Sequence, residues 1–426
     1  MSTAATHTMP TELSRQYADR NRGRLPVAPW WMHLALMLFL VSCVFDPADR
    51  LLGAKVWLFL LCWAGTLATC DWRSRSVSPA LLAYSVAFVA IPLASVALYW
   101  LRNGGEPYEG LALLKGYLLI GLAPMLVLSR IDLLPALCAV LTVLALTIIG
   151  TFVALWLEPD LYAALYLFGT STGIVLLDMR EYGSDLSLLQ VYFVTSPMLA
   201  IPITYYFVRA WTAARRREAL RCWILTLLTI AGMLLAGTRN NMLASVLLPI
   251  GLFVLCARHR ALGALGALLV VTAAAALYAG ELAALLDPTE ISNQIKLALL
   301  RDYARAFENP VDLLIGQGLG AYQYWEAKSD FYFISELTYL ELLRNFGLFG
   351  AAAMLALLAF PIVRSFQRHR GLGEKGLALG YIAYLVMCIS NPNLFSSMGI
   401  TFLSVMLANL YRKRNAPPPP SARTSA

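Results

Sequence analysis

Bilayer-length runs of apolar residues, separated by short polar segments, follow one another along almost the whole chain. A helix needs roughly 20 apolar residues to cross a hydrocarbon core about 30 Å thick, and an open chain can satisfy its backbone groups there only as a helix. This criterion predicts about twelve spans, which lie near residues 30–45, 51–70, 77–101, 111–129, 133–157, 186–208, 222–237, 240–257, 261–280, 336–363, 373–390 and 394–411. We therefore expect an all-α, polytopic membrane protein.

The spans set the expected domain order. Residues 1–29 form an N-terminal segment, 30–280 hold the first nine spans, 281–335 form a large loop with helical content, 336–411 hold the last three spans, and 412–426 form a disordered, proline-containing tail. A composition that is 59% hydrophobic and only 14% charged lies far from that of soluble proteins.

Lysine and arginine distinguish the two sides of this topology. With the N-terminus in the cytoplasm, most of the 33 cations fall in cytoplasmic segments and most acidic residues fall outside, which is the asymmetry expected of a membrane protein. Both termini are therefore expected in the cytoplasm and the loop 281–335 on the outer face. The net charge of +8 belongs to the cytoplasmic loops, so it predicts no nucleic-acid partner.

Cysteine and histidine show no metal-binding or redox pattern. The seven cysteines lie within or at the ends of apolar runs without a CxxC spacing, and the four histidines lie in the first span or on the cytoplasmic side. Neither a disulfide framework nor a metal site is predicted, and the cysteines are expected to pack as small apolar residues.

The polar stretch 281–336 is the longest interruption of the apolar pattern. Within it, the spacing of apolar positions in Ile291–Phe307 predicts an amphipathic helix lying on the membrane. Gly316-Gln317-Gly318-Leu319-Gly320 lacks the preceding strand and the Lys-Ser/Thr of a phosphate loop, so we expect a turn of unusual torsion. A second outer segment, 158–185, contains an apolar patch at 161–168 that predicts a re-entrant or interfacial helix.

Arg239 lies between two apolar runs at the expected outer face, in Gly237-Thr238-Arg239-Asn240-Asn241. In one interpretation its guanidinium points into a water-filled cavity and binds the oxygens of a phosphate. In the other it is a snorkelling side chain at a tight turn, which is the commoner behaviour of a lone arginine. Arg301 and Arg305 lie one helical turn apart and share a face that suits a second anion contact.

Three ionisable residues occur at or inside the start of the tenth span: Glu336, Glu341 and Arg344. An ionisable residue within a span is a functional hypothesis by default. Glu341 and Arg344 are three residues apart and are expected to neutralise each other. Glu336 lacks such a neighbour, so it is the better candidate for a general base with a raised pKa.

Four motifs, taken in order, resemble the O-antigen ligase and O-antigen polymerase superfamily of bacterial envelope glycosyltransferases. They are Arg239-x-x-x-Leu243, the segment Leu300–Pro310, the glycine-spaced Gly316–Gly320, and the helix start from Glu336 to Gly350. Each motif is short, and the resemblance rests on their order, their spacing and the number of predicted spans.

This resemblance implies a wholly helical glycosyltransferase of the bacterial inner membrane that acts at the periplasmic face without a metal ion or other cofactor. Its donor is a glycan on undecaprenyl diphosphate. Arg239 matches the family arginine near the donor diphosphate, and Arg301 matches the arginine of the periplasmic loop. Arg305, Tyr322 and Tyr339 are further candidates for substrate contact. The implied partners are a lipid-linked or lipid A-core acceptor, membrane lipids, and a chain-length regulator or other polysaccharide-assembly proteins.

Glu336 distinguishes two branches of the superfamily, because the ligase pattern has a histidine at the matching position. The start of this helix looks more like that of the polymerases, so we predict polymerisation of lipid-linked repeat units of O-antigen or exopolysaccharide, with Arg239 and Glu336 as catalytic residues. The alternative within the family is a ligase that joins a finished glycan to lipid A-core or protein. A transporter or flippase instead predicts facing charges at mid-membrane, whereas the polar residues here gather at the outer face.

Overall fold

The computed structural model describes residues 29–49, 53–70, 77–104, 108–182, 186–257, 265–266, 268, 272, 291–326, 329–332 and 335–412. It is 78% helix and 5% strand. The expected N-terminal segment and C-terminal tail lie outside the described residues, apart from Pro29 and Arg412, and so does most of the expected ninth span at 261–280.

Seven helices of the described chain are long and apolar enough to cross a membrane. They are α4 (Pro79–Asn103), α5–η1–α6 (Tyr108–Leu118, Leu119–Gly121 and Leu122–Ser129), α7 (Leu134–Leu157), α10 (Arg216–Leu235), α11 (Arg239–Cys256), α16 (Thr338–Ser365) and α17–η3 (Leu372–Met387 and Cys388–Ser390). Two shorter apolar helices, α2 (Trp30–Phe45) and α3 (Lys55–Thr69), precede them. The protein is therefore a mostly helical, membrane-embedded polytopic protein.

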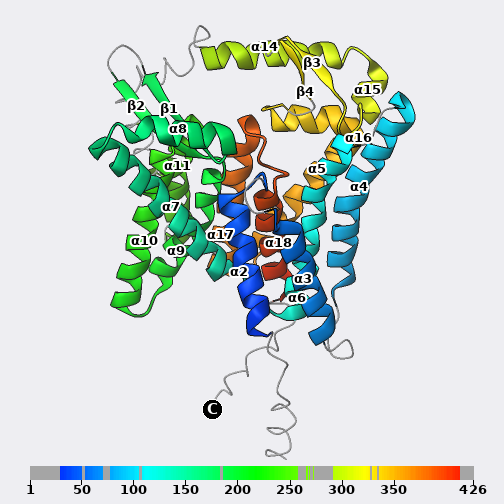
Figure 1. Cartoon of the computed structure of the whole chain (residues 1–426). Coiled ribbons are helices and arrows are strands. Elements are labelled where there is room, and N and C mark those ends of the chain that lie inside the picture. The colour runs from blue at the N-terminus through cyan, green and yellow to red at the C-terminus, as the bar shows by residue number, and fades with distance from the viewer. Residues whose placement is uncertain are drawn as a thin grey trace, which may run out of the picture.

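Helix α18 (Ser397–Arg412) lies at the centre of the bundle (Figure 1), and almost all of its side chains are buried. Next to it, α17 packs against α9 (Ala200–Thr212) at close range. A Cβ added to Gly380 of α17 would lie 2.8 Å from the Thr204 side chain of α9, and one added to Gly376 would lie 2.6 Å from Val208. Small residues thus allow these two helices to approach closely, as they do in membrane bundles generally.

The connections that carry several arginines lie at one end of the bundle, which we call the basic end. The contact of Val208, near the end of α9, with Gly376, near the start of α17, places the α9–α10 and α16–α17 connections at the same end. The last helix reaches this end as well, because Arg412 forms a 2.9 Å ion pair with Asp132 in the α6–α7 connection. The opposite end carries the non-membrane elements, and we call it the loop end (Figure 1).

A β-hairpin at the loop end corrects one prediction. Residues 186–193 were expected to begin a helical span, but they form β2 (Leu186–Phe193), paired antiparallel with β1 (Val175–Tyr182). Val191 and Phe193 are buried while Leu176 and Met179 are exposed. A short apolar run is compatible with a strand as well as with a helix. Counting apolar residues therefore wrongly assigned residues 186–193 to a membrane span. The strands are followed by η2 (Ser196–Leu199) and α9.

The segment 158–185, where a re-entrant or interfacial helix was expected, contains the helix α8 (Leu161–Thr172). In the large loop, the expected amphipathic helix is confirmed as α14 (Ile291–Ala306). It crosses above the bundle toward α15 (Pro310–Ile315) (Figure 1). A second small hairpin, β3 (Gln323–Trp325) with β4 (Asp330–Tyr332), follows and was not predicted.

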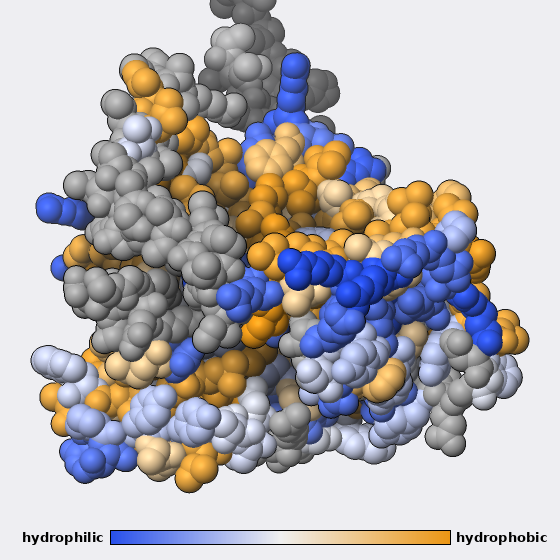
Figure 2. Space-filling view, turned by 90° about the horizontal axis from the view of Figure 1, so that it is seen from above, coloured by the Kyte–Doolittle hydropathy of each residue, from blue (hydrophilic) through white to orange (hydrophobic). Residues whose placement is uncertain are grey.

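Helix α16 is broken at Gly347, where φ is 65° and ψ is −178°. The break separates a short first segment, residues 338–346, from the part that descends through the bundle (Figure 1). Glu341 and Arg344 therefore lie in the first segment, beneath the loop elements. Seen from the loop end, hydrophilic side chains form a band across the surface that is bordered by apolar residues (Figure 2).

Candidate functional site

A buried ion pair between Glu341 and Arg344 joins the loop to the bundle. The Arg344 side chain has no exposed surface, and its Nη2 and Nε donate to the two Glu341 carboxylate oxygens at 2.5 and 3.1 Å. Asn345 Nδ2 donates to the same carboxylate at 3.0 Å. The expected mutual neutralisation is thus confirmed, in the two-pronged geometry that arginine and carboxylate favour.

The same pair holds three parts of the large loop. Tyr303 of α14 donates its hydroxyl to Glu341 at 2.7 Å. Arg344 Nη1 donates to the Gln317 side chain at 3.1 Å and to the Ala321 carbonyl at 2.9 Å, and its guanidinium lies 5.8 Å from the Trp325 ring centroid. One buried guanidinium therefore fixes the glycine-spaced segment and β3, while its partner carboxylate fixes α14.

The glycine-spaced segment is a close-packed turn. Gly316, Gly318 and Gly320 all have positive φ, at 84°, 98° and 94°. A Cβ on Gly318 would lie 2.5 Å from Tyr99 Cβ of α4, and one on Gly320 would lie 2.4 Å from the backbone nitrogen of Gly110 of α5. The expected turn of unusual torsion is confirmed, and its glycines serve backbone packing against α4, α5 and the break in α16.

Arg239 lies at the first turn of α11, at the loop end. Thr238 caps this helix by accepting a hydrogen bond from the Asn241 backbone at 3.2 Å. The half-buried Arg239 side chain donates from Nη1 to Asn293 Oδ1 of α14 at 3.0 Å. The guanidinium thus sits at a helix N-terminus, where the unsatisfied backbone N–H groups and the helix dipole already favour an anion.

The two asparagines after Arg239 anchor this turn to its neighbours. Asn240 Nδ2 donates to Ser390 Oγ at 2.8 Å, at the end of η3. Asn241 is fully buried and donates to Ser196 Oγ of η2 at 2.8 Å. Because both side chains are held by hydrogen bonds, the backbone that presents Arg239 is fixed from two sides.

Glu336 reaches the same region from the other direction. Thr338, two residues later, donates its hydroxyl to the Asn391 carbonyl at 2.7 Å, directly after the Ser390 that binds Asn240. Glu336 is half-buried. Its negative charge also acts on Tyr192 of β2, whose pKa is raised above the ordinary value chiefly by burial and in smaller part by Glu336.

The residues around Arg239 and Glu336 form a group of polar side chains at the loop end, which we call the polar layer. Its members are Arg239, Asn240, Asn241, Asn293, Ser196, Tyr192, Ser390, Asn391, Asn393 and Glu336. Asn393 completes it by donating to the Val194 carbonyl at 2.9 Å and to the Tyr192 hydroxyl at 3.4 Å. The layer joins α14, the start of α11, the end of α17–η3, the β2–η2 connection and the segment that precedes α16. The layer thus gathers a cation, a carboxylate and several amides at the loop end.

Most residues of this layer were not predicted from the sequence. Asn391 and Asn393 flank Pro392 at the break between α17 and α18, and Tyr192 lies in the strand that was expected to be a helix. The available signal was the Asn-Pro-Asn sequence inside an apolar region, since polar amides at a helix break are expensive unless they are bound.

The remaining predicted site residues lie in three places. Tyr339 belongs near the layer, because its hydroxyl donates to the Leu385 carbonyl of α17 at 2.7 Å. Tyr322 is placed at α5, where it donates to Glu109 at 3.1 Å. Arg301 is exposed on α14, and Arg305 is 56% exposed and paired with Glu326. The structure therefore brings Arg239, Glu336 and Tyr339 to the same end of α17.

An apolar cavity of about 330 Å³ lies beside the hairpin. Its walls come from α2, α7, α8 and the hairpin, and they include Phe45, Leu165, Phe168, Val175 and Phe193. Phe193 lines this cavity, whereas Tyr192 of the polar layer precedes it in the strand and therefore points to the opposite face of the hairpin. An almost wholly apolar wall of this kind suits a hydrocarbon chain and offers nothing to a sugar.

Within the described ranges, no three His, Cys, Asp or Glu side chains gather in a way that would hold a metal ion. All seven cysteines are free thiols, and six of them are buried. Comparison of the chain with protein-family models, with curated proteins and with solved structures found no match.

Proposed function

We propose that this protein is a glycosyltransferase of the bacterial inner membrane that polymerises undecaprenyl-diphosphate-linked oligosaccharide repeat units. The observation that carries the proposal is the placement of Arg239. This residue combines a helix N-terminus with a guanidinium held by Asn293 at the loop end of a membrane bundle. Such an arrangement suits a lipid diphosphate, whose charged group lies at the membrane surface.

In the proposed reaction Arg239 binds the diphosphate of the donor. When the bond between the anomeric carbon and the diphosphate oxygen breaks, negative charge builds on the leaving diphosphate. A guanidinium and a helix N-terminus that are already in place stabilise that charge without reorganisation. Arg301, exposed on α14 about 12 Å along the helix from Asn293 by the ordinary rise per residue, supplies a second cation if α14 moves toward the donor.

Glu336 is proposed to accept the proton of the acceptor hydroxyl. That oxygen attacks the anomeric carbon on the face opposite to the diphosphate, so one C–O bond forms as the other breaks and the configuration is inverted. The Thr338–Asn391 hydrogen bond fixes the backbone beside Glu336, which supports a positioned base. Tyr339 and Tyr192 lie in the same region, and burial raises the pKa of Tyr192 further above its ordinary value.

Two further features support a lipid-linked substrate. The apolar cavity beside the hairpin offers a place for hydrocarbon at the loop end. The charge asymmetry favours a topology in which the basic end faces the cytoplasm, so the polar layer faces the periplasm in the proposed protein with about twelve spans. The acceptor is then a second lipid-linked repeat, and a chain-length regulator is an expected partner.

A deletion strain of the source bacterium tests the proposal. Loss of a polymerase leaves a single repeat unit on its acceptor, whereas loss of a ligase leaves long glycan stranded on the lipid carrier. We expect the first result, and we expect complementation by the wild-type gene and by Arg217→Ala, which changes an exposed arginine at the basic end. Arg239→Ala should accumulate in the membrane and fail to restore polymer.

Each other result has a definite meaning. Stranded long glycan in the deletion strain replaces polymerase activity with ligase activity. Full polymer from Arg239→Ala refutes the role of the arginine. Accumulation of repeat units on the cytoplasmic side instead assigns the protein to the transporters.

A further inference from the structure

A cavity at the basic end lies away from the polar layer. It measures about 590 Å³, within the ordinary size range of small-ligand sites. Its walls come from the α16–α17 connection and the end of α18, and the residues are Arg364, Gln367, His369, Arg370, Gly371, Glu374, Leu410 and Tyr411. We call it the basic pocket.

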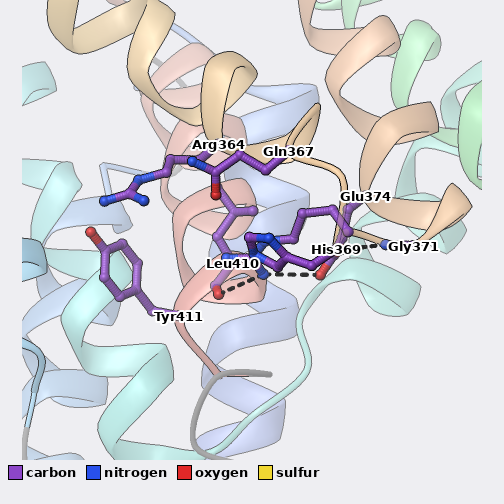
Figure 3. A pocket seen from close by; sticks show the side chains of 8 residues that line it. Arg364, Gln367, His369, Gly371, Glu374, Leu410 and Tyr411 are labelled. Carbon is purple, nitrogen blue, oxygen red and sulfur yellow. Dashed lines mark hydrogen bonds and ion pairs between the residues drawn. The ribbon is translucent and has the colours of Figure 1, made fainter.

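The walls of the basic pocket combine cations with hydrogen-bond donors. Figure 3 shows the Arg364 guanidinium and the Tyr411 hydroxyl turned toward the same side of the pocket. The only carboxylate in its lining is Glu374, which is already bound by Arg370 at 3.3 Å and by the Gly371 backbone nitrogen at 2.9 Å. The Glu374 carboxylate is therefore already neutralised by neighbouring residues, and the charges that line the pocket are positive in sum.

Arg370 supplies a second indication that the pocket binds an anion. Its Nη1 donates to the Leu410 carbonyl at 3.2 Å as well as to Glu374. Its Nε is buried, and among the described residues it has no hydrogen-bond acceptor. Buried donors in proteins normally have a hydrogen-bond acceptor. An acceptor oxygen bound in the pocket would provide one for the Arg370 Nε.

Exposed apolar side chains lie beside the pocket. Val363 and Phe366, on either side of Arg364 and Ser365, are 65% and 42% exposed. Exposed apolar side chains of a membrane bundle meet lipid tails, and basic pockets between helices on the cytoplasmic side suit phosphate head groups. A ligand with one phosphate and an attached hydrocarbon chain satisfies both surfaces together.

We propose that the basic pocket binds the phosphate head group of an anionic phospholipid, with its acyl chains along Val363 and Phe366. Arg364 and Arg370 bind the phosphate oxygens, and Tyr411 and Gln367 donate to the same group or to the glycerol next to it. The site is separate from the polar layer, and it does not depend on the proposed glycosyl transfer.

Lipid retention by the purified full-length protein tests this site. Native mass spectrometry in detergent measures how much phosphatidylglycerol or phosphatidylcholine stays bound at each lipid concentration. We expect wild-type protein to prefer phosphatidylglycerol. Arg364→Gln should weaken phosphatidylglycerol binding by about tenfold, the size expected for one lost charge-assisted hydrogen bond, and should leave phosphatidylcholine binding unchanged.

Two variants serve as controls. Arg217→Gln removes one exposed arginine from the same end of the bundle, so it matches the change in charge and should retain wild-type preference. Arg364→Lys keeps the charge without the planar fork and should give an intermediate affinity. Because Arg364 is exposed, both changes at this position are expected to leave the purified protein folded, as its elution profile and thermal unfolding will show.

Three results would overturn the proposal. Equal retention of both lipids by wild-type protein removes the head-group preference. Equal losses in Arg364→Gln and Arg217→Gln attribute the effect to overall charge. The third result has two parts: wild-type protein shows no lipid preference, and inorganic pyrophosphate raises the thermal unfolding temperature of wild-type protein but not of Arg364→Gln. That result assigns the pocket to a soluble phosphate compound instead.

Discussion

Replacing Glu341 with glutamine should release the large loop from the bundle. Arg344 is fully buried, and both oxygens of Glu341 accept hydrogen bonds from its guanidinium. Removing one partner of a buried ion pair costs about 3–5 kcal/mol, because the other charge is left without compensation. Glutamine keeps the shape and one acceptor, so we expect the lower end, about 3 kcal/mol.

The loss should appear as local opening, because Arg344 and Glu341 between them hold Gln317, Ala321 and Tyr303. A change of about 3 kcal/mol corresponds to roughly a hundredfold increase in the open population. Limited proteolysis of the purified protein measures it as the cleavage rate between α14 and α16. Thermal unfolding of the same samples shows whether the bundle itself remains intact.

A surface pair in the same loop provides the matched control. Arg305 and Glu326 also form an ion pair, but their side chains are 56% and 59% exposed, and exposed pairs contribute little to stability. Glu326→Gln should therefore cleave at the wild-type rate. If Glu341→Gln cleaves no faster than Glu326→Gln, the buried pair does not hold the loop and the reasoning is wrong.

Three other outcomes follow from the geometry. Gly318→Ala should destabilise the loop, because its φ is 98° and its Cβ would lie 2.5 Å from Tyr99; proteolysis measures this, and Gly371→Ala, at a position with open space, is its control. Burial, with a smaller effect of Glu341, raises the pKa of the Tyr303 hydroxyl above its ordinary 10.0. The contribution of Tyr303 to stability should therefore be complete below pH 10 and fall as the pH rises further. Tyr303→Phe should remove this loss of stability at alkaline pH, and an equal loss in wild-type protein and in Tyr303→Phe would contradict the prediction. Arg301→Gln should reduce polymer formation more than Arg305→Gln, because Arg305 is already paired with Glu326; equal activity in both variants removes Arg301 from the mechanism.

Amphipathic spacing and glycine chemistry were readable from the sequence because they are local. Ile291–Phe307 has apolar residues at helical intervals, and α14 spans residues 291–306 of it. Gly316, Gly318 and Gly320 predicted backbone of unusual torsion, and all three have positive φ. In both cases the neighbours in sequence determine the conformation.

Long-range contacts were not readable in the same way. Arg344 and Glu341 were paired correctly from their spacing, but the contacts with Gln317 and Tyr303 join distant segments. The strand at 186–193 was mistaken for a span because its partner, and not its own composition, determines its structure. Asn393 shows the same limit, since its partners Tyr192 and Val194 are far away in the sequence.

The most direct test of the proposed function is glycosyl transfer by the purified protein with a lipid-linked repeat unit as donor and acceptor. We expect wild-type protein to make polymer, and Arg239→Lys to lose roughly a hundredfold to a thousandfold in rate, as when one transition-state donor is removed. Glu336→Gln should lose activity too, while Arg217→Gln keeps it. Polymer formation by Arg239→Lys at the wild-type rate would contradict the central claim.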